Sequence, residues 1–264
     1  MRKVISVALP KGGVGKTTTA VNLAASLAVA EKKVLLIDAD PSGTCAIYLG
    51  IENEQTTGSL FEVLSFTRRI SQVITKTQIP MLDFIASGEP SYHHEDRISR
   101  LTGNLNLFSN MLTHELGEYD YIIIDCPPYL KGFTTIALIA SDSIIIPMRA
   151  GQFSITALKR MVEHVKWVRS AYNHKLSIEG ILLTMYESHS KAWTMTRKDI
   201  ERDLGPFLFT TSIPRSTVLT VSEFQGKPAV LFDAKAKGSL AYMSLAMEIM
   251  EKDMGLRRPA VGVQ

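Results

Sequence analysis

The feature that most constrains the fold of this chain is a glycine-rich octapeptide near its N-terminus, Lys11-Gly12-Gly13-Val14-Gly15-Lys16-Thr17-Thr18. The apolar run from Val4 to Leu9 predicts a buried strand before it, and residues 18–30 carry alanine and leucine at helical spacing after it. A strand, a glycine loop and a helix in this order predict a phosphate-binding unit, because the glycines let backbone N–H groups curl around an anion. A mobile glycine turn is the alternative, but it leaves the Lys and Thr after the last glycine unexplained.

Two side chains directly after the last glycine suit a nucleoside triphosphate with magnesium. Lys16 is placed to reach the terminal phosphates, and the Thr17 hydroxyl is placed to ligate Mg²⁺. One position departs from the general phosphate-loop pattern, because Pro10 stands where that pattern has glycine and Lys11 follows it.

With this departure the loop resembles the deviant Walker A loop of the ParA/MinD family of ATPases. The resemblance implies that residues 11–18 bind ATP. It also implies that Lys11 reaches across a dimer interface to the phosphates of the partner's nucleotide. Taken alone, Lys11 has a plain alternative, a solvated lysine at the mouth of a loop.

The stretch from Lys33 to Asp38 predicts a second buried strand that ends on a carboxylate, with Asp40 two residues later. Carboxylates at the C-terminal end of a parallel strand face the crevice where ligands bind in open α/β sheets. The segment resembles the family's DxDPQG switch, which implies that Asp40 orients the attacking water and that Asp38 supports the magnesium site. Ser42 stands in place of the family's Gln. An Asp-Pro turn with a capping aspartate is the alternative.

A third carboxylate ends the apolar stretch 121–124, in which four hydrophobic residues precede Asp125. This is a Walker B pattern, whose carboxylate holds magnesium. The pattern is weak alone, but the glycine loop and the following Cys-Pro-Pro, a form found in the ParA family, strengthen it. We therefore expect Thr17, Asp38 and Asp125 to form the metal site.

Composition and cysteine usage fit a reduced, cytoplasmic protein. No apolar run approaches the ~20 residues that span a bilayer. Cys45 and Cys126 are far apart, without metal-ligand spacing, and the pair His93-His94 has no third ligand near it. Residues 1–150 hold 13 Lys and Arg against 15 Asp and Glu, whereas residues 151–264 hold 16 against 11. The basic C-terminal half is compatible with polyanion binding and equally with an ordinary surface.

Alternating strand and helix patterns predict an α/β protein with the fold of a P-loop NTPase: a doubly wound, mostly parallel sheet flanked by helices on both faces. Without a linker or repeat, we expect one domain over residues 1–264 and no N-terminal helix-turn-helix domain. Residues 97–116 show loose helical periodicity. Further strands are expected at 143–147, 176–184 and 207–213, and further helices at 58–64, 154–171, 191–204 and 239–254.

The resemblance to ParA/Soj proteins extends over nearly the whole chain. It includes the segments 179–185, Ile213-Pro214-Arg215, Gly226-Lys227-Pro228 and 233–238, and it is loosest over residues 50–115. In relatives, the segments at Met185 and Pro214 border the adenine ring, so the resemblance implies that both residues bind nucleotide here.

The implied activity is slow ATP hydrolysis by an ATP-dependent homodimer that binds DNA without sequence preference. A ParB-like partner would stimulate hydrolysis, and the protein would be cytoplasmic and associated with the nucleoid. The tail after Gly255 has few bulky apolar residues, so no stable membrane association is expected.

Contacts to DNA phosphates require only lysine or arginine on one face. A solvated surface role is the alternative for each candidate, and residues 216–219 lack the arginine that relatives often carry there. The candidates are Arg197, Arg215, Lys227, Lys235 and Lys237.

Three functions remain open at this point. The first is partitioning of a chromosome or plasmid. The second is a sibling ATPase that uses the nucleoid to position another cargo, such as a protein cluster or microcompartment. The third is a division-site regulator at the membrane, like MinD. ATP-dependent, salt-sensitive DNA binding would favour the first two, and ATP-dependent liposome binding the third.

Overall fold

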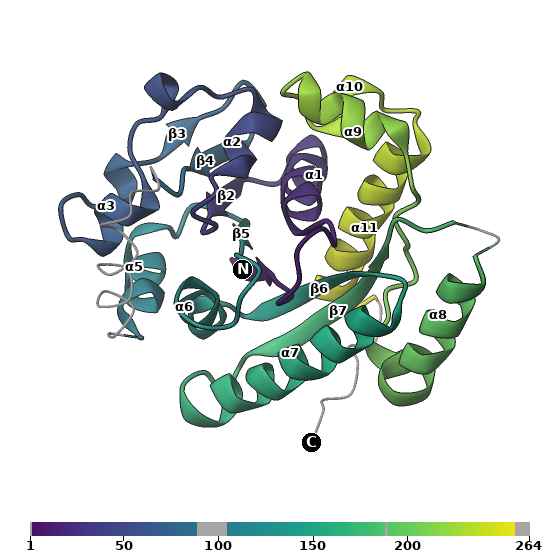
Figure 1. Ribbon diagram of the computed structural model, residues 1–264. Helices are drawn as coiled ribbons and strands as arrows, with labels where there is room; N and C mark the ends of the chain where they lie inside the picture. The colour runs from purple at the N-terminus through teal and green to yellow at the C-terminus, as the bar shows by residue number, and fades with distance from the viewer. Residues whose placement is uncertain (1, 89–104, 188–189, 257–264) are drawn as a thin grey trace.

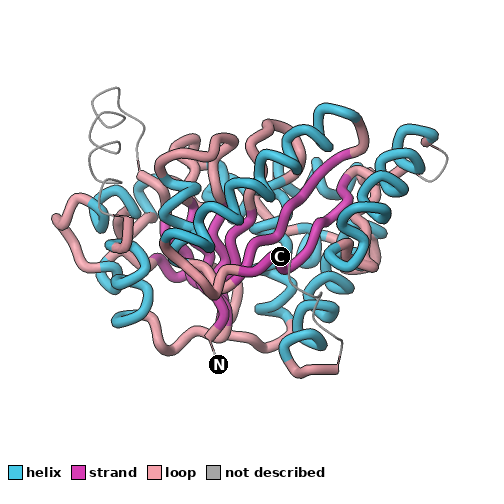
Figure 2. Tube along the Cα trace, turned by 90° about the horizontal axis from the view of Figure 1, so that it is seen from below, coloured by secondary structure: helices cyan, strands magenta, loops and turns pink. Residues whose placement is uncertain are grey.

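The computed structural model describes residues 2–88, 105–187 and 190–256. It contains one seven-stranded sheet with helices on both of its faces (Figure 1, Figure 2). The strands are β1 (Lys3–Val7), β2 (Val34–Asp38), β3 (Thr75–Lys76), β4 (Leu82–Ile85), β5 (Tyr121–Asp125), β6 (Ser143–Arg149) and β7 (Ser177–Thr184).

Helices and strands alternate along much of the chain, but residues 191–253 hold helices with no strand between them, and single turns of 3₁₀ helix stand at 53–55, 70–72 and 205–207. In the described part of the chain, no helix combines the length and apolar character needed to cross a bilayer. The helices are α1 (Lys16–Val29), α2 (Thr44–Leu49), α3 (Leu60–Leu64), α5 (Leu107–Glu115), α6 (Phe133–Ala140), α7 (Gln152–Ala171), α8 (Lys191–Leu204), α9 (Thr217–Phe224), α10 (Ala229–Phe232) and α11 (Lys237–Asp253).

The sheet has the strand order β3-β4-β2-β5-β1-β6-β7. All neighbouring strands are parallel except β3, which pairs antiparallel with β4 at one edge. Chain order reverses beside β1, and ligands bind at such switch points, at the carboxyl ends of the strands. The predicted doubly wound, mostly parallel P-loop fold is confirmed.

Both faces of the sheet are buried, which is why its central strands are almost continuously apolar. Successive residues of β5 alternate between two cores, with Ile122 and Ile124 on one face and Ile123 on the other. One core includes buried residues of α5, α6 and α7, and the other includes buried residues of α1, α2 and α11. The sheet thus holds the glycine loop and the strand-end aspartates on a rigid base.

The strand predicted over residues 207–213 is wrong. The chain there runs beside β7 and forms an isolated bridge with it at Leu208, and further along the backbone N–H of Ile213 donates to the carbonyl of Leu183 at 2.8 Å. Glu248 of α11 accounts for the difference, because its carboxylate accepts the backbone N–H groups of Thr210 and Thr211 at 2.9 and 3.0 Å. Those two amides therefore cannot take part in a ladder with β7. Of the predicted helix over 97–116, α5 covers residues 107–115, while residues 97–104 and the pair His93-His94 lie outside the described residues.

A charge cluster around the buried Glu179 ties the two ends of the described chain together near the start of β1, at the end of the strands opposite the glycine loop. Glu179 of β7 contacts Lys3 Nζ at 2.7 Å and Lys252 Nζ at 3.3 Å, and it accepts a hydrogen bond from the Ser143 hydroxyl at 2.6 Å. Burial alone would raise the pKa of Glu179, but Lys3 and Lys252 hold it below its ordinary value. The charged form of Glu179 therefore stabilises the folded chain.

We expect Glu179→Gln to lower the free energy of unfolding by about 2–3 kcal/mol at pH 7, because it leaves two partly buried ammonium groups without one partner. The stabilisation from a carboxylate with a lowered pKa is present above its unfolded value of 4.5 and is lost as pH falls below it. Urea unfolding at pH 7 and pH 4 should therefore show a smaller difference at pH 4. Glu118→Gln, which removes an exposed ion pair with Lys33, is the control and should change little.

Candidate active site

The glycine loop between β1 and α1 has a backbone conformation that favours glycine. Gly13 and Gly15 have φ angles of 66° and 84°, in the left-handed region. Nothing lies within 4 Å of the position that a Cβ on Gly12 or Gly13 would occupy. Gly15 caps α1 without a side chain, so the first backbone N–H groups of the helix face the loop. An open loop of this shape at a helix N-terminus fits a phosphate group.

Both lysines of the loop are held by groups of the same chain. The buried Lys16 donates from Nζ to the backbone carbonyl of Lys11 at 3.2 Å. Burial lowers the pKa of Lys16, and the charges of Asp125 and Asp40 act in the opposite direction. Lys11 donates from Nζ to the Ser154 hydroxyl at 3.0 Å. The two ammonium groups therefore sit at different places, one beneath the loop and one at its mouth.

The structure brings Thr17 and Asp125 together as the sequence predicts. The Thr17 hydroxyl donates to Oδ2 of Asp125 at 2.6 Å. The other carboxylate oxygen, Oδ1, is buried and has no hydrogen-bond partner among the described residues. Burial raises the pKa of Asp125 to about 7, although Thr17 and Lys16 act against this shift. A buried, unpartnered carboxylate oxygen beside a hydroxyl fits a cation that prefers oxygen ligands.

Asp38 lies beside Asp125 because β2 and β5 pair with these two residues in register. Its carboxylate accepts the backbone N–H groups of Asp40 and Cys45, each at 3.0 Å. Burial and the charge of Asp125 together raise the pKa of Asp38 well above its ordinary value. Ligand atoms of Asp38, Cys45 and Asp125 all lie within 4.8 Å of one another. Two buried carboxylates this close are costly without a cation, and their oxygens with that of Thr17 suit Mg²⁺.

Asp40 lies in the loop between β2 and α2, partly exposed, on the same side of the sheet as the glycine loop. Its Oδ1 accepts the backbone N–H of Ser42 at 3.0 Å, which fixes the turn. Ser42 itself is exposed. Asp40 lies close enough to the loop and to β5 that its charge acts on the pKa of both Lys16 and Asp125.

A cleft of about 650 Å³ opens beside the loop, and Met185 and Pro214 both line it. Tyr186 forms a bridge with Pro214, which holds the two segments side by side. The same cleft is lined by Gly13, Gly15 and Thr18, so the predicted base-binding and phosphate-binding residues meet in one space. A concave site with apolar walls and a polar end suits a nucleotide.

Sequence reasoning did not select several other residues that line this cleft, among them Tyr48, Arg149, Thr184 and Trp193. Arg149 and Thr184 end strands β6 and β7, and the position after a parallel strand was the available signal for both. The Thr184 hydroxyl donates to the carbonyl of Val14 at 2.9 Å, which ties β7 to the glycine loop. Tyr48 and Trp193 come from α2 and α8, and no local pattern marks them.

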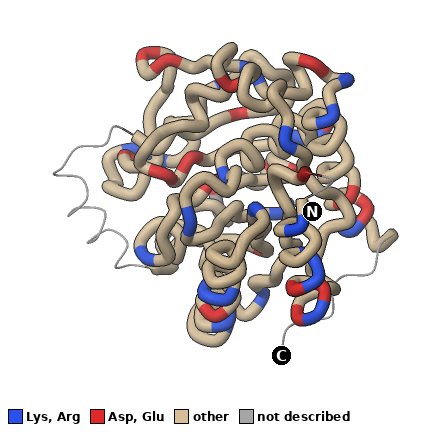
Figure 3. The backbone as a smooth tube through the Cα atoms, turned by 45° about the vertical axis from the view of Figure 1, so that its right-hand side comes forward, with Lys and Arg blue, Asp and Glu red and all other residues tan. Residues whose placement is uncertain are grey.

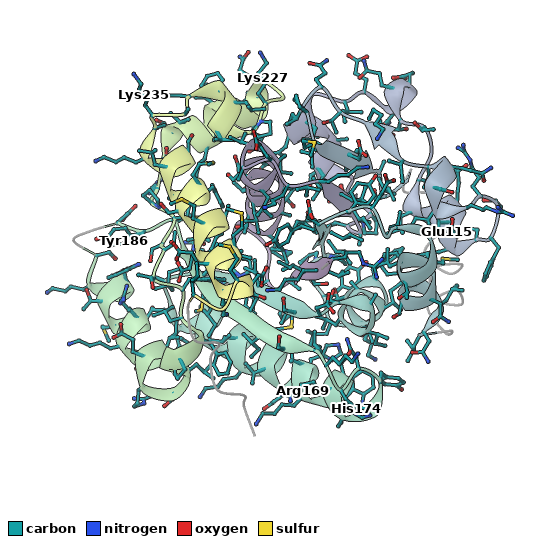
Figure 4. The ribbon with its side chains drawn as sticks, turned by 180° about the vertical axis from the view of Figure 1, so that it is seen from behind. Glu115, Arg169, His174, Tyr186, Lys227 and Lys235 are labelled. Carbon is teal, nitrogen blue, oxygen red and sulfur yellow. The ribbon has the colours of Figure 1, made fainter. Side chains whose placement is uncertain are left out.

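The five predicted DNA contacts fall into two groups. Arg197 of α8 pairs with Glu201 at 2.7 Å, and Arg215 pairs with Glu187 at 2.8 Å and lines the cleft. Lys227, Lys235 and Lys237 are exposed on the segment that joins α9 to α11. In Figure 4, Lys227 and Lys235 project from the same end of the molecule.

Other surface charges are mixed rather than gathered. Figure 3 shows lysine and arginine interspersed with acidic residues on the face that it presents. Within the described ranges, none of Lys227, Lys235 and Lys237 forms an ion pair. These three lysines are therefore exposed cations without a carboxylate partner in the described part of the structure.

Comparisons with known proteins agree with this geometry. A family model described as an AAA domain matches residues 2–178. The chromosome partitioning protein ParA of Caulobacter vibrioides is 33% identical over 265 residues, covering 95% of this chain and 95% of that protein. The sporulation initiation inhibitor protein Soj of Bacillus subtilis is 35% identical over 259 residues, covering 94% of this chain and 98% of that protein.

Among solved structures, cobyrinic acid a,c-diamide synthase from Mycobacterium smegmatis with bound ADP and magnesium is similar over 99% of both chains, with a TM-score of 0.83 and 25% identity. The residues that the family model matches include the glycine loop and the strand-end aspartates. The chain therefore belongs to the ParA/Soj family and is a P-loop ATPase that uses ATP and Mg²⁺.

Proposed function

We propose that this ATPase partitions DNA as an ATP-dependent homodimer that binds DNA without sequence preference and responds to a ParB-like partner. The observation that carries the proposal is the position of Lys11. Its ammonium group lies at the outer side of the glycine loop, beside Ser154, whereas the ammonium group of Lys16 is held against the loop backbone, where it is placed to bind the phosphates of the subunit's own nucleotide. A second cation outside the cradle suits the triphosphate of a facing subunit. The names of the relatives, chromosome partitioning ParA and Soj, support the same activity.

In this proposal the protein works by positioning and charge neutralisation, without a covalent intermediate. Lys16 and the backbone of residues 12–17 hold the phosphates of the subunit's own nucleotide. Thr17 and Asp125, supported by Asp38, hold Mg²⁺, which neutralises phosphate charge when bound. Asp40 orients the water that attacks the terminal phosphate. Met185 and Pro214 border the base.

Lys11 couples hydrolysis to assembly. If it completes the site of a facing subunit, the closed dimer is stabilised by the terminal phosphate that both subunits contact, and loss of that phosphate separates them. Slow hydrolysis then acts as a timer for DNA release. A ParB-like partner on the cargo would shorten that time, and the protein would be found on the nucleoid in the cytoplasm.

The DNA-binding face is assigned to Lys227, Lys235 and Lys237, with Arg197 and Arg215 as secondary candidates because each is already paired with a glutamate. Dimerisation would present two copies of this face to one duplex. Each lysine alone contributes a weak, sequence-independent contact with a DNA phosphate, so DNA affinity depends on the combined contribution of all these contacts. DNA affinity therefore requires the ATP-bound dimer.

Fluorescence anisotropy with two unrelated duplexes should test this assignment. With a non-hydrolysable ATP analogue and Mg²⁺, both duplexes should bind equally, and affinity should fall steeply between about 50 and 200 mM salt. The double variant Lys227→Ala/Lys235→Ala should weaken binding about tenfold and reduce the log–log salt slope by about two per subunit.

The matched control for that experiment is Lys175→Ala, an exposed lysine in the turn between α7 and the start of β7. It should leave both affinity and slope unchanged. Binding that is independent of nucleotide, or an unchanged slope in the double variant, would contradict the assigned face. Analogue-dependent binding to anionic lipid vesicles, with none to DNA, would instead favour a membrane-associated regulator.

A further inference from the structure

The thiol of Cys45 lies inside the carboxylate cluster at the ends of β2 and β5. Cys45 is the second residue of α2 and is fully buried. Its Sγ lies 3.5 Å from Oδ2 of Asp125, and its backbone N–H donates to the carboxylate of Asp38 at 3.0 Å. The spacing of the cysteines in the sequence does not indicate a metal site, because the two carboxylates come from other segments. Folding therefore brings one sulfur and two carboxylates together.

The distances within this cluster fit a metal ion with tetrahedral coordination. A Zn–O bond of about 2.0 Å and a Zn–S bond of about 2.3 Å, meeting at a tetrahedral angle, separate the oxygen from the sulfur by about 3.5 Å. The separation of Asp125 Oδ2 and Cys45 Sγ is 3.5 Å. Ligand atoms of Asp38, Cys45 and Asp125 all lie within 4.8 Å of one another. Three protein ligands with a fourth position open to water are an arrangement that Zn²⁺ adopts in proteins.

Three further observations support a ligand at this point. Oδ1 of Asp125 is buried and, in the described chain, has no hydrogen-bond partner, which is costly for a carboxylate without a cation. The carboxylate of Asp38 accepts the backbone N–H groups of Asp40 and Cys45, which fixes its orientation as outer-shell hydrogen bonds fix a metal ligand. Asp38 also lines a second cleft, of about 950 Å³, which gives an ion a route to the cluster.

The sulfur distinguishes this set of ligands from that of the magnesium site. Mg²⁺ prefers oxygen ligands in octahedral geometry, and the Thr17 hydroxyl, Asp125 and the phosphates of a nucleotide are all oxygen donors. Thiolate ligands instead select softer ions, of which Zn²⁺ is one. Because both sets of ligands include Asp125, the two ions compete for the same carboxylate.

We propose that Cys45 gives this ATPase a second metal specificity, in which Asp38, Cys45 and Asp125 hold a thiophilic divalent cation such as Zn²⁺ in place of Mg²⁺. The thiol gives its proton to solvent as the metal–sulfur bond forms. An ion at this position occupies Asp125 and thereby excludes the Mg²⁺ that ATP hydrolysis uses. The inference goes beyond the proposed function, since it requires neither DNA nor a facing subunit.

Absorption spectroscopy of the nucleotide-free chain with Co²⁺ tests the proposal. Zn²⁺ has no absorption band to follow, whereas Co²⁺ bonded to a thiolate gives a charge-transfer band in the near ultraviolet. The band should grow with added Co²⁺ and level off at about one ion per chain. Equimolar Zn²⁺ should remove the band, whereas equimolar Mg²⁺ should leave it in place.

The two buried cysteines provide a matched pair of variants. Cys126 is also fully buried, but its Sγ contacts the carbonyl of Ile124 at 3.8 Å and does not belong to the cluster. Cys45→Ser keeps the size of the side chain and removes the sulfur, so it should abolish the band, whereas Cys126→Ser should retain it. Cys45→Ala and Cys126→Ala repeat the comparison without a new hydroxyl at either buried position, and circular dichroism checks that each variant is folded.

Competition with a chelator measures the affinity for Zn²⁺ itself. Loss of an outer-shell partner alone weakens metal binding by about 10–100-fold, so loss of the direct ligand in Cys45→Ser should weaken Zn²⁺ binding by at least about 100-fold. ATP hydrolysis at fixed Mg²⁺ and buffered free Zn²⁺ then gives the functional readout. Zn²⁺ should inhibit the wild type and Cys126→Ser alike, and it should inhibit Cys45→Ser only at far higher concentrations.

Four results would overturn the inference: a wild type without the thiolate band, a band that persists in Cys45→Ser, a band that a folded Cys126 variant lacks, or equal inhibition of the wild type and Cys45→Ser by Zn²⁺. Each of them leaves the proposed function standing, because dimerisation and DNA binding are measured with Mg²⁺ alone. A wild type that fails to dimerise or to bind DNA would in turn overturn the proposed function and leave the metal site untouched.

Discussion

Replacing Lys16 by alanine should abolish measurable ATP binding. Lys16 is the one lysine buried beneath the glycine loop in the described chain, and its pKa is lowered by burial, which signals a desolvated ammonium group beside the phosphate cradle. Removing several charge-assisted hydrogen bonds to phosphate should weaken affinity by about 100-fold or more. Isothermal titration calorimetry with ATP and Mg²⁺ measures the loss directly.

Lys175→Ala is again the control, because it removes one positive charge from the turn before β7 without touching the loop. It should bind ATP as the wild type does. Circular dichroism of Lys16→Ala should match the wild type, which separates loss of the site from loss of the fold. Retained nanomolar affinity in Lys16→Ala would refute its assigned role.

Replacing Asp40 by alanine should produce a long-lived ATP-bound dimer that hydrolyses little. Asp40 is the carboxylate at the site that remains partly exposed, whereas Asp38 and Asp125 are buried in the metal cluster. Loss of the group that positions the attacking water should lower the turnover number by at least about 100-fold, with nucleotide affinity retained. Phosphate release measures the first effect, and sedimentation with ATP measures the second.

Glu163→Gln provides a comparison, because Glu163 is an exposed carboxylate on α7 outside the cleft. It should hydrolyse ATP at the wild-type rate. An Asp40→Ala protein that is only monomeric in the presence of ATP, or that hydrolyses ATP normally, would show that the water is oriented elsewhere.

The parts of the site that follow from the sequence are those that a single strand or loop determines. The octapeptide needs only β1 before it and α1 after it, and Asp38 and Asp125 each end one apolar strand. Parallel pairing of β2 and β5 then places these two carboxylates side by side without further information. The family and the fold class follow from the same segments and are confirmed, whereas the roles of individual residues in hydrolysis and DNA binding stay predictions.

Other features depend on partners that are remote in sequence. Almost every residue of α6 is buried, so its sequence has no alternation of polar and apolar residues at helical spacing from which the helix could be predicted. The chain over 207–213 resembles a strand by composition, but two of its backbone N–H groups donate to the Glu248 carboxylate and not to a neighbouring strand. The cleft residues Tyr48 and Trp193 come from helices that meet only in the folded protein. No local pattern carries this information.

β1 bears the glycine loop and ends at Val7, yet its neighbours in the sheet, β5 and β6, begin only at Tyr121 and Ser143. A nascent chain therefore displays the complete octapeptide long before there is anything to hold it in shape. Closing so long a loop costs entropy that only the finished core repays. We therefore expect nucleotide to bind tightly only to subunits in which β5 and β6 already flank β1.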